Sequence, residues 1–122
     1  MARILIVEDN ESLRLAYQTF LEAEGYEIAT ASRVQEALDY LANNTPDVIL
    51  LDMLMPEVNG LELLQKYDIR NEHKDVKVIA FSNLTEMRIE QEAKMLGVSL
   101  YLTKAATTPT ELIQKVKALL SA

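Results

Sequence analysis

Short and almost continuous apolar runs alternate along the chain with segments in which apolar residues recur every three or four positions. Apolar runs of this length predict strands buried on both faces, and the second pattern predicts amphipathic helices. The predicted strands cover residues 3–7, 26–31, 47–51, 76–81 and 99–103. A helical pattern follows each of them, so the chain is expected to form consecutive βα units.

Each predicted helix carries an apolar stripe that can pack against a sheet. In chain order the stripes consist of Leu13, Tyr17, Phe20 and Leu21; Val34, Ala37, Leu38 and Leu41; Leu61, Leu64 and Ile69; Ile89, Ala93 and Leu96; and Leu112, Val116, Leu119 and Leu120. Because crossovers between parallel strands are right-handed, this order predicts an α/β fold. We expect a doubly wound five-stranded parallel sheet with helices on both faces.

Capping residues stand near the expected ends of several predicted helices. Gly25 and Gly97 each stand where a helix should end, just before a strand. Ser32 with Gln35 forms a candidate capping box, and the sequence TPTE at 108–111 forms a stronger one.

Composition narrows the class of protein. With 122 residues, 49 % of them hydrophobic, we expect one domain over residues 1–122 with no output domain in this chain. The net charge of −7 argues against direct binding to nucleic acid or to an anionic membrane. The absence of cysteine excludes disulfides, zinc–thiolate sites and cysteine nucleophiles. No signal sequence and no apolar stretch of about 18 residues is present, so we expect a cytoplasmic protein.

Polar residues stand where the predicted strands end. In chain order they are Glu8 and Asp9, then Asp52, then Ser82 and Asn83, then Lys104. The carboxyl ends of parallel strands lie at one edge of the sheet, where doubly wound folds bind ligands. Three carboxylates in one place repel one another, so we expect a divalent cation, and oxygen ligands favour Mg²⁺ or Mn²⁺ over Zn²⁺.

These motifs, in this order, resemble the receiver domain of bacterial two-component response regulators, of the stand-alone chemotaxis-regulator type. VEDN resembles the family's acidic pair, and LLDMLMPEVNG, in which Pro56 and Gly60 are expected to form a loop, resembles its phosphoacceptor strand and loop. VIAFSN supplies a switch hydroxyl, and YLTK supplies an aromatic residue and a lysine. The resemblance covers essentially the whole chain and implies a flavodoxin-like sheet with strand order 2-1-3-4-5.

The resemblance also implies a phosphoacceptor and a metal site. Asp52 would accept a phosphoryl group, and a carboxylate needs no general base because it is already ionised at neutral pH. Mg²⁺ would be held by Glu8 and Asp9, with help from Asp52 and the backbone carbonyl of Leu54.

The remaining site residues would bind the phosphoryl group and change conformation when it is bound. Lys104 and Ser82 would each contact a phosphoryl oxygen, and Ser82 with Tyr101 would form the switch. The implied partner surface lies on the last two predicted helices and the strand between them, and it includes Met87, Glu90, Lys94 and Tyr101. The implied phosphodonor is a sensor histidine kinase, a histidine phosphotransfer protein or a small molecule. A downstream protein would then bind the altered surface.

Several of these residues also have simpler structural interpretations. Asp9 or Asn10 can cap the first helix, and Ser82 can be an ordinary loop residue. Lys104 can be a solvated surface lysine, and Tyr101 can serve only as packing in an edge strand.

Three further residues near these motifs are not assigned to the site. We expect His73 to be a solvated loop residue, and Met53 and Met55 to fill gaps in the core.

Two other classes of function stay open on the sequence alone. An aspartyl-phosphate phosphatase of the haloacid-dehalogenase type would carry a second acid two residues after the nucleophile, where this chain has Leu54. A receiver-shaped module that is never phosphorylated would lose one of the key acids or the lysine. The feature in its favour is Ala105, because the family's lysine is usually followed by proline.

Two leucines predict a long-lived phosphorylated form. Leu54 and Leu84 stand two positions after Asp52 and Ser82, where a polar side chain could orient the hydrolytic water. Leucine has no hydrogen-bonding group, so we expect slow dephosphorylation.

Overall fold

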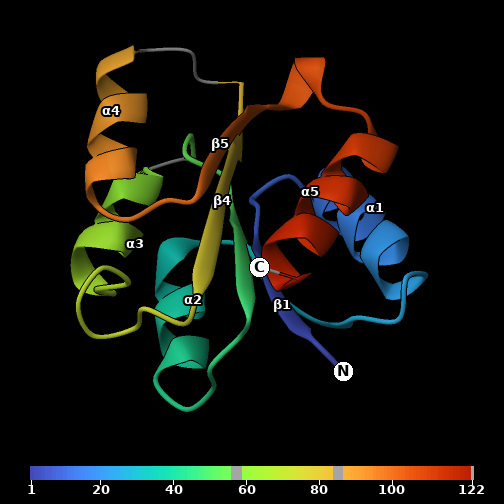
Figure 1. Ribbon diagram of the computed structural model, residues 1–122, viewed down its shortest axis with the longest axis horizontal. Helices are drawn as coiled ribbons and strands as arrows, with labels where there is room; N and C mark the ends of the chain where they lie inside the picture. The colour runs from blue at the N-terminus through green and yellow to red at the C-terminus, as the bar shows by residue number, and fades with distance from the viewer. Residues whose placement is uncertain (56–58, 84–86, 122) are drawn as a thin grey trace.

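The computed structural model describes residues 1–55, 59–83 and 87–121. In chain order they form β1 (Arg3–Val7), α1 (Glu11–Glu22), β2 (Glu27–Ala31), α2 (Val34–Leu41), β3 (Val48–Leu51), α3 (Gly60–Lys66), β4 (Lys77–Ser82), α4 (Met87–Met95), β5 (Leu100–Thr103), a short 3₁₀ helix η1 (Lys104–Ala106) and α5 (Pro109–Ser121). The five strands are all parallel, in the order β2-β1-β3-β4-β5 (Figure 1). The predicted fold class and strand order are therefore confirmed, although β2 to β5 each begin one residue later than predicted.

Helices cover both faces of the sheet (Figure 1): α1 and α5 lie on one face, and α2, α3 and α4 lie on the other. Side chains alternate between the faces along the central strands, so β1 and β3 each contribute to two cores. The core beneath α2, α3 and α4 contains Leu5, Val7, Ile49 and Leu51. The core beneath α1 and α5 contains Ile4, Ile6, Val48 and Leu50. Within the described chain, no helix is long and apolar enough to cross a bilayer.

The predicted apolar stripes are confirmed most clearly in three helices. The buried stripe residues there are Val34, Ala37 and Leu41 in α2, Ile89 and Ala93 in α4, and Leu112 and Val116 in α5. The prediction that Ile69 belongs to the stripe of α3 is wrong, because the helix ends at Lys66. Ile69 is buried, but it lies in the segment that follows the helix.

The stripe assigned to α1 is wrong in two of its members. Leu21 is buried and Tyr17 is half-buried, but Leu13 and Phe20 are 37 % and 38 % exposed. At 3.6 residues per turn, these two side chains point roughly 80–100° away from Leu21. Only a narrow side of α1 therefore reaches the sheet, and the helix carries apolar side chains on its surface.

Two predicted helix-end signals are confirmed. Gly25 and Gly97 have φ values of +92° and +105°, in the left-handed region that favours glycine. The capping box before α5 is closed, since the N–H of Glu111 donates to Thr108 Oγ1 over 3.1 Å and the N–H of Thr108 donates to Glu111 Oε1 over 3.2 Å.

The capping box predicted from Ser32 and Gln35 is wrong. The hydroxyl and the N–H of Ser32 both donate to the carboxylate of Glu36. The N-cap of α2 is Arg33, so the third helical residue, which can reach back, is Glu36.

Three residues near the predicted motifs have structural roles. Met53 and Met55 are buried in the core beneath α2, α3 and α4, as expected. His73 lies in a loop, as expected, but it is half-buried instead of fully solvated, because its ring stacks on Tyr67 with the ring centroids 4.0 Å apart and the planes inclined by 6°. The segment after α3 folds back onto the end of that helix and half-buries the imidazole.

Candidate functional site

Three carboxylates meet at the carboxyl ends of β1 and β3, the upper ends of these strands in Figure 1. Glu8 and Asp9 directly follow β1, and Asp52 directly follows β3, whose last residue is paired with the last residue of β1. One oxygen from each carboxylate lies within 4.8 Å of the others. Glu8 and Asp52 are buried, at 2 % and 5 % exposure, whereas Asp9 is exposed. The structure thus brings together the three acids expected from the sequence, here called the acidic cluster.

Lys104 extends from the end of β5 into the acidic cluster. Its Nζ donates a hydrogen bond to Glu8 Oε1 and lies 3.3 Å from Asp52 Oδ2. The lysine side chain is only 11 % exposed, so the interpretation as a solvated surface lysine is wrong. A buried ammonium between two buried carboxylates offsets part of their mutual repulsion.

Burial raises the pKa of Glu8, and the negative charge of Asp52 adds to this rise. Hydrogen bonds from Lys104 and from the backbone N–H of Asn10, which donates to Glu8 Oε2 over 3.1 Å, act in the opposite direction. The surroundings of Glu8 thus favour its charged form less than water does, and a bound cation would favour that form.

The loop after β1 is held by residues that the sequence did not mark as part of the site. Asn10 caps α1 by accepting the N–H of Leu13 over 3.0 Å, which confirms one of the two capping candidates. Arg14 Nη1 donates to the carbonyl oxygen of Glu8 over 3.0 Å. Arg14 follows no strand end, so no pattern in the sequence connected it with the acids.

Tyr17 also lies within the field of the acidic cluster. Burial, followed by the charges of Glu8 and Asp52, raises the pKa of Tyr17 to about 12. Its ring packs edge-on against Phe81, with the ring centroids 5.2 Å apart. The sequence indicated only that Tyr17 belongs to the apolar stripe of α1.

The backbone around Asp52 fixes the orientation of its carboxylate. The N–H of Leu54 donates to Asp52 Oδ1 over 3.0 Å, and the N–H of Asp52 donates to the Val7 carbonyl oxygen over 3.0 Å. The N–H of Gly60 donates to the Met53 carbonyl oxygen over 2.9 Å. A β-carbon on Gly60 would lie 2.8 Å from Met53 Sδ and 2.9 Å from the Asp52 carbonyl oxygen. Only glycine allows this close approach of α3 to the Asp52 segment.

Gly60 is the first residue of α3, so the prediction that it belongs to the loop is wrong. Asn59 caps the helix through its side-chain oxygen, which accepts the N–H of Leu61 over 3.0 Å. Pro56 and Leu84, which the sequence analysis also singled out, lie outside the described residues.

Ser82 and Tyr101 occupy the predicted side of the site. Ser82 is the last residue of β4, fully buried, and it pairs with Thr103 of β5. Tyr101 is half-buried in β5 and packs against the core beneath α2, α3 and α4. This placement agrees with a packing role for Tyr101, while its role in a switch stays a prediction.

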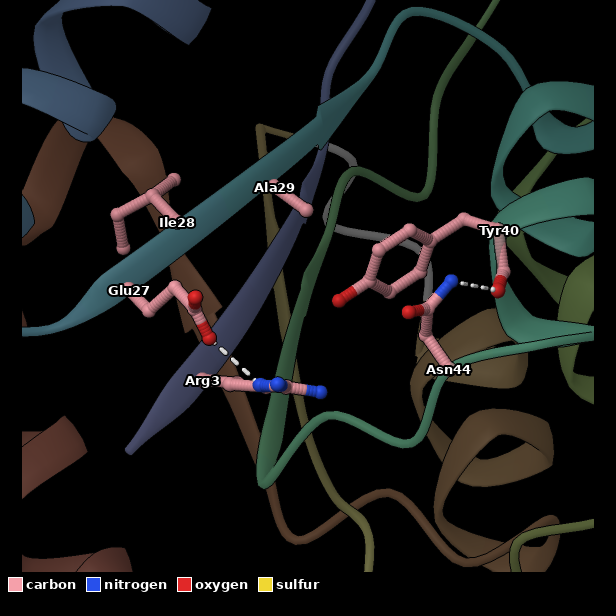
Figure 2. Close-up of a pocket in the computed structure, with 6 residues that line it drawn as sticks. All are labelled: Arg3, Glu27, Ile28, Ala29, Tyr40 and Asn44. Atoms are coloured by element: carbon pink, nitrogen blue, oxygen red, sulfur yellow. Dashed lines mark hydrogen bonds and ion pairs between the residues drawn. The ribbon is translucent and has the colours of Figure 1, made fainter. Parts of the chain in front are cut away.

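A hollow of about 220 Å³ lies at the opposite end of the sheet (Figure 2). Arg3 and Glu27, the first residues of β1 and β2, form an ion pair at its rim, and the Asn44 side chain donates to the Tyr40 carbonyl oxygen. None of the residues expected from the sequence to act in the site lines this hollow.

Comparisons with known proteins find a family model, curated relatives and solved structures that are similar to this chain. The family model described as response regulator receiver domain matches residues 4–117. The chain is 34 % identical over 120 residues to the phosphate regulon transcriptional regulatory protein PhoB of Rhizobium meliloti, a match that covers 98 % of this chain and 52 % of PhoB. It is 32 % identical over 117 residues to the polar-differentiation response regulator DivK of Brucella anthropi, which covers 96 % of this chain and 94 % of DivK. The chain thus spans about half of PhoB and nearly all of DivK.

Solved structures show the same fold. A CheY-like response regulator receiver domain protein from Methanospirillum hungatei superposes with a TM-score of 0.91 at 29 % identity, covering 99 % of this chain and 94 % of that one. The response regulator TrrA of Thermotoga maritima, in complex with Mg²⁺ and BeF, superposes with a TM-score of 0.84 at 34 % identity, covering 98 % and 99 %.

Proposed function

Since the chain belongs to the response regulator receiver domain family, we propose that it is a phosphorylation-activated switch of a two-component system with Asp52 as phosphoacceptor. The observation that carries this proposal is a buried aspartate held at a strand end beside two further acids and one buried lysine. Family membership removes the alternative of a haloacid-dehalogenase-type phosphatase. A receiver that is never phosphorylated stays as an outcome of the test below.

Asp52 is held as a nucleophile by its surroundings. The Leu54 N–H binds Oδ1 and Lys104 approaches Oδ2, so the carboxylate has one orientation toward an incoming phosphorus atom. A carboxylate oxygen forms the bond to phosphorus while the bond from phosphorus to the donor breaks. The electron pair of the broken bond stays with the donor, either acetate or the imidazole nitrogen of a histidine. Phosphoryl transfer depends mainly on such positioning and on charge neutralisation.

The donor set fits Mg²⁺, because it consists of carboxylate oxygens and because these acids are only partly compensated by Lys104. Glu8, Asp9, Asp52 and the backbone carbonyl of Leu54 would hold the ion. When bound, Mg²⁺ supplies positive charge to the acids and to a phosphoryl oxygen. Lys104 and Ser82 would bind the other phosphoryl oxygens, the first by its charge and the second by its hydroxyl group.

We propose that the output surface lies on α4 and β5. Met87 and Met95 are 73 % and 69 % exposed, and Lys94 pairs with Glu90 over 2.9 Å on the same helix. Exposed methionines offer an adaptable apolar contact for a partner protein. Phosphorylation would draw Ser82 toward the phosphoryl group and bias the position of Tyr101, and with it this surface.

The proposed partners follow from this arrangement. The phosphodonor is a sensor histidine kinase or a histidine phosphotransfer protein, and the target is a protein that binds the α4–β5 surface. We also propose a cytoplasmic location and no direct contact of this domain with nucleic acid or membrane.

Incubation with acetyl phosphate followed by intact mass measurement tests the proposed function. We expect wild type to gain one phosphoryl group in Mg²⁺ and none in excess chelator. Asp52→Asn should gain none, whereas Asp39→Asn, a control in an exposed side chain on α2, should behave as wild type. Equal labelling of Asp52→Asn and wild type, or no labelling of wild type by any donor, would overturn the proposal.

A further inference from the structure

The turn after β5 is closed by a side chain from the end of β4. The N–H of Ala105 donates a hydrogen bond to Asn83 Oδ1 over 2.9 Å. Ala105 is the second residue of η1, whose N-cap residue Thr103 makes no side-chain capping bond. The first N–H groups of a helix have no partner within the helix, so they need an acceptor from elsewhere. Asn83, which directly follows β4, supplies the acceptor that Thr103 does not.

This hydrogen bond joins the two segments that carry the switch hydroxyl and the lysine. Ser82, directly before Asn83, pairs with Thr103, directly before Lys104, at the last paired position of β4 and β5. Lys104 opens η1, and its ammonium reaches the acidic cluster. Fixing the N–H of Ala105 therefore fixes the backbone from which the Lys104 side chain projects.

The residue at position 105 makes this bond possible. A proline at this position would have a fixed φ and no N–H to donate. Ala105 leaves the turn without the rigidity of a proline ring, and its exposed N–H needs an acceptor, which is either water or a side chain. The Asn83 side chain meets both requirements in this chain.

We propose that Asn83 is a positioning residue that acts through Lys104. Its side-chain oxygen anchors the turn after β5 and thereby holds the Lys104 ammonium at the acidic cluster. The kinetic part of this inference rests on the proposed phosphorylation of Asp52, whereas the anchoring itself does not. One hydrogen bond of this kind corresponds to about a three- to tenfold change in a rate or an equilibrium.

Amide hydrogen exchange in the metal-free protein tests the anchor directly. Asn83→Ala removes the acceptor, and we expect the Ala105 amide to exchange about three- to tenfold faster, as measured by NMR. Asn83→Asp keeps an oxygen acceptor at the same place and is expected to restore slow exchange. Ala105 exchange that is unchanged in Asn83→Ala would overturn the anchor.

Measuring the Mg²⁺ affinity and the phosphorylation rate of Asn83→Ala distinguishes a displaced Lys104 from a general loss of structure. The ammonium repels a cation at the acidic cluster, so releasing it in Asn83→Ala should raise Mg²⁺ affinity about two- to threefold. The same variant should accept phosphate from acetyl phosphate about three- to tenfold more slowly at saturating Mg²⁺. A variant that only destabilised the fold would lose both, so parallel losses, or no change in either, contradict the proposal.

The Lys104→Met background decides whether Asn83 acts through the lysine. We expect Asn83→Ala to change neither the Mg²⁺ affinity nor the residual rate in that background. A further loss there would show that Asn83 acts by another route. If wild type is not phosphorylated at all, the proposed function fails, while amide exchange and Mg²⁺ affinity still decide the role of Asn83.

Discussion

Replacing Lys104 by methionine tests whether the lysine stabilises the fold by compensating the negative charge of the acidic cluster. Methionine keeps most of the side-chain volume but removes the ammonium, which lies 3.3 Å from Asp52 Oδ2 and bonds Glu8. At an effective dielectric constant of about 20, one charge pair at this separation is worth about 5 kcal/mol. Part of that attraction is offset by the desolvation of the buried ammonium, and water reaches the cluster at Asp9. We therefore expect the free energy of unfolding to fall by about 3 kcal/mol at neutral pH.

Urea unfolding without divalent metal measures this loss, which should shift the midpoint by about 1–2 M for a domain of this size. The matched control is Lys66→Met, which removes an exposed pair with Glu62 in α3 whose atoms are 3.0 Å apart. An exposed pair of this kind contributes only about 0.3–0.5 kcal/mol. A loss in Lys104→Met no larger than in the control would refute the idea that the ammonium compensates the cluster.

The loss of unfolding free energy in Lys104→Met should also depend on pH, and it should be smaller at low pH. A carboxyl group whose pKa is higher in the folded than in the unfolded protein favours folding at low pH, and this stability is lost as the pH rises through the folded pKa. The Lys104 hydrogen bond lowers the raised pKa of Glu8, so its removal raises that pKa further. The difference between variant and wild type should therefore shrink as the pH falls toward the ordinary glutamate value of 4.5. A difference that is constant over this range contradicts the explanation.

Three other predictions follow from the site. Mg²⁺ at ten times its dissociation constant should stabilise wild type against urea by about 1.4 kcal/mol, and Asp9→Asn should lose most of this gain. Gly60→Ala should lower the free energy of unfolding by about 1–3 kcal/mol, since its β-carbon would lie 2.8 Å from Met53 Sδ, and an unchanged thermal midpoint would show that α3 moves without cost. Leu54→Asn should speed dephosphorylation roughly tenfold, because the 59 % exposed leucine side chain cannot orient water, and loss of label with time measures this rate.

The sequence was sufficient to predict the sheet and all three members of the acidic cluster. Buried parallel strands need continuous apolar runs, and each run here stops at a polar residue, so Asp52 and Lys104 mark the ends of β3 and β5. Since parallel strand ends share one edge, residues far apart in the sequence could be placed in one site without knowledge of side-chain positions.

What the sequence could not predict depends on how side chains are directed in space. The stripe of α1 included Leu13 and Phe20 because periodicity marks apolar residues without showing how wide the contact with the sheet is. The contacts of Arg14 with the Glu8 backbone and of Asn83 with Ala105 also leave no pattern. Each requires two segments of the chain to approach at a particular distance, which only the folded chain determines.

Borohydride trapping of the phosphorylated protein tests the central claim most directly. Borohydride reduces an aspartyl phosphate to homoserine, and peptide mass spectrometry then identifies the residue that carried the phosphoryl group. After reaction with acetyl phosphate and Mg²⁺, we expect homoserine at position 52 alone, in the peptide that contains Met53 and Leu54. Homoserine at Asp9 or at another acid, or label that resists borohydride, would contradict the assignment of Asp52 as the phosphoacceptor.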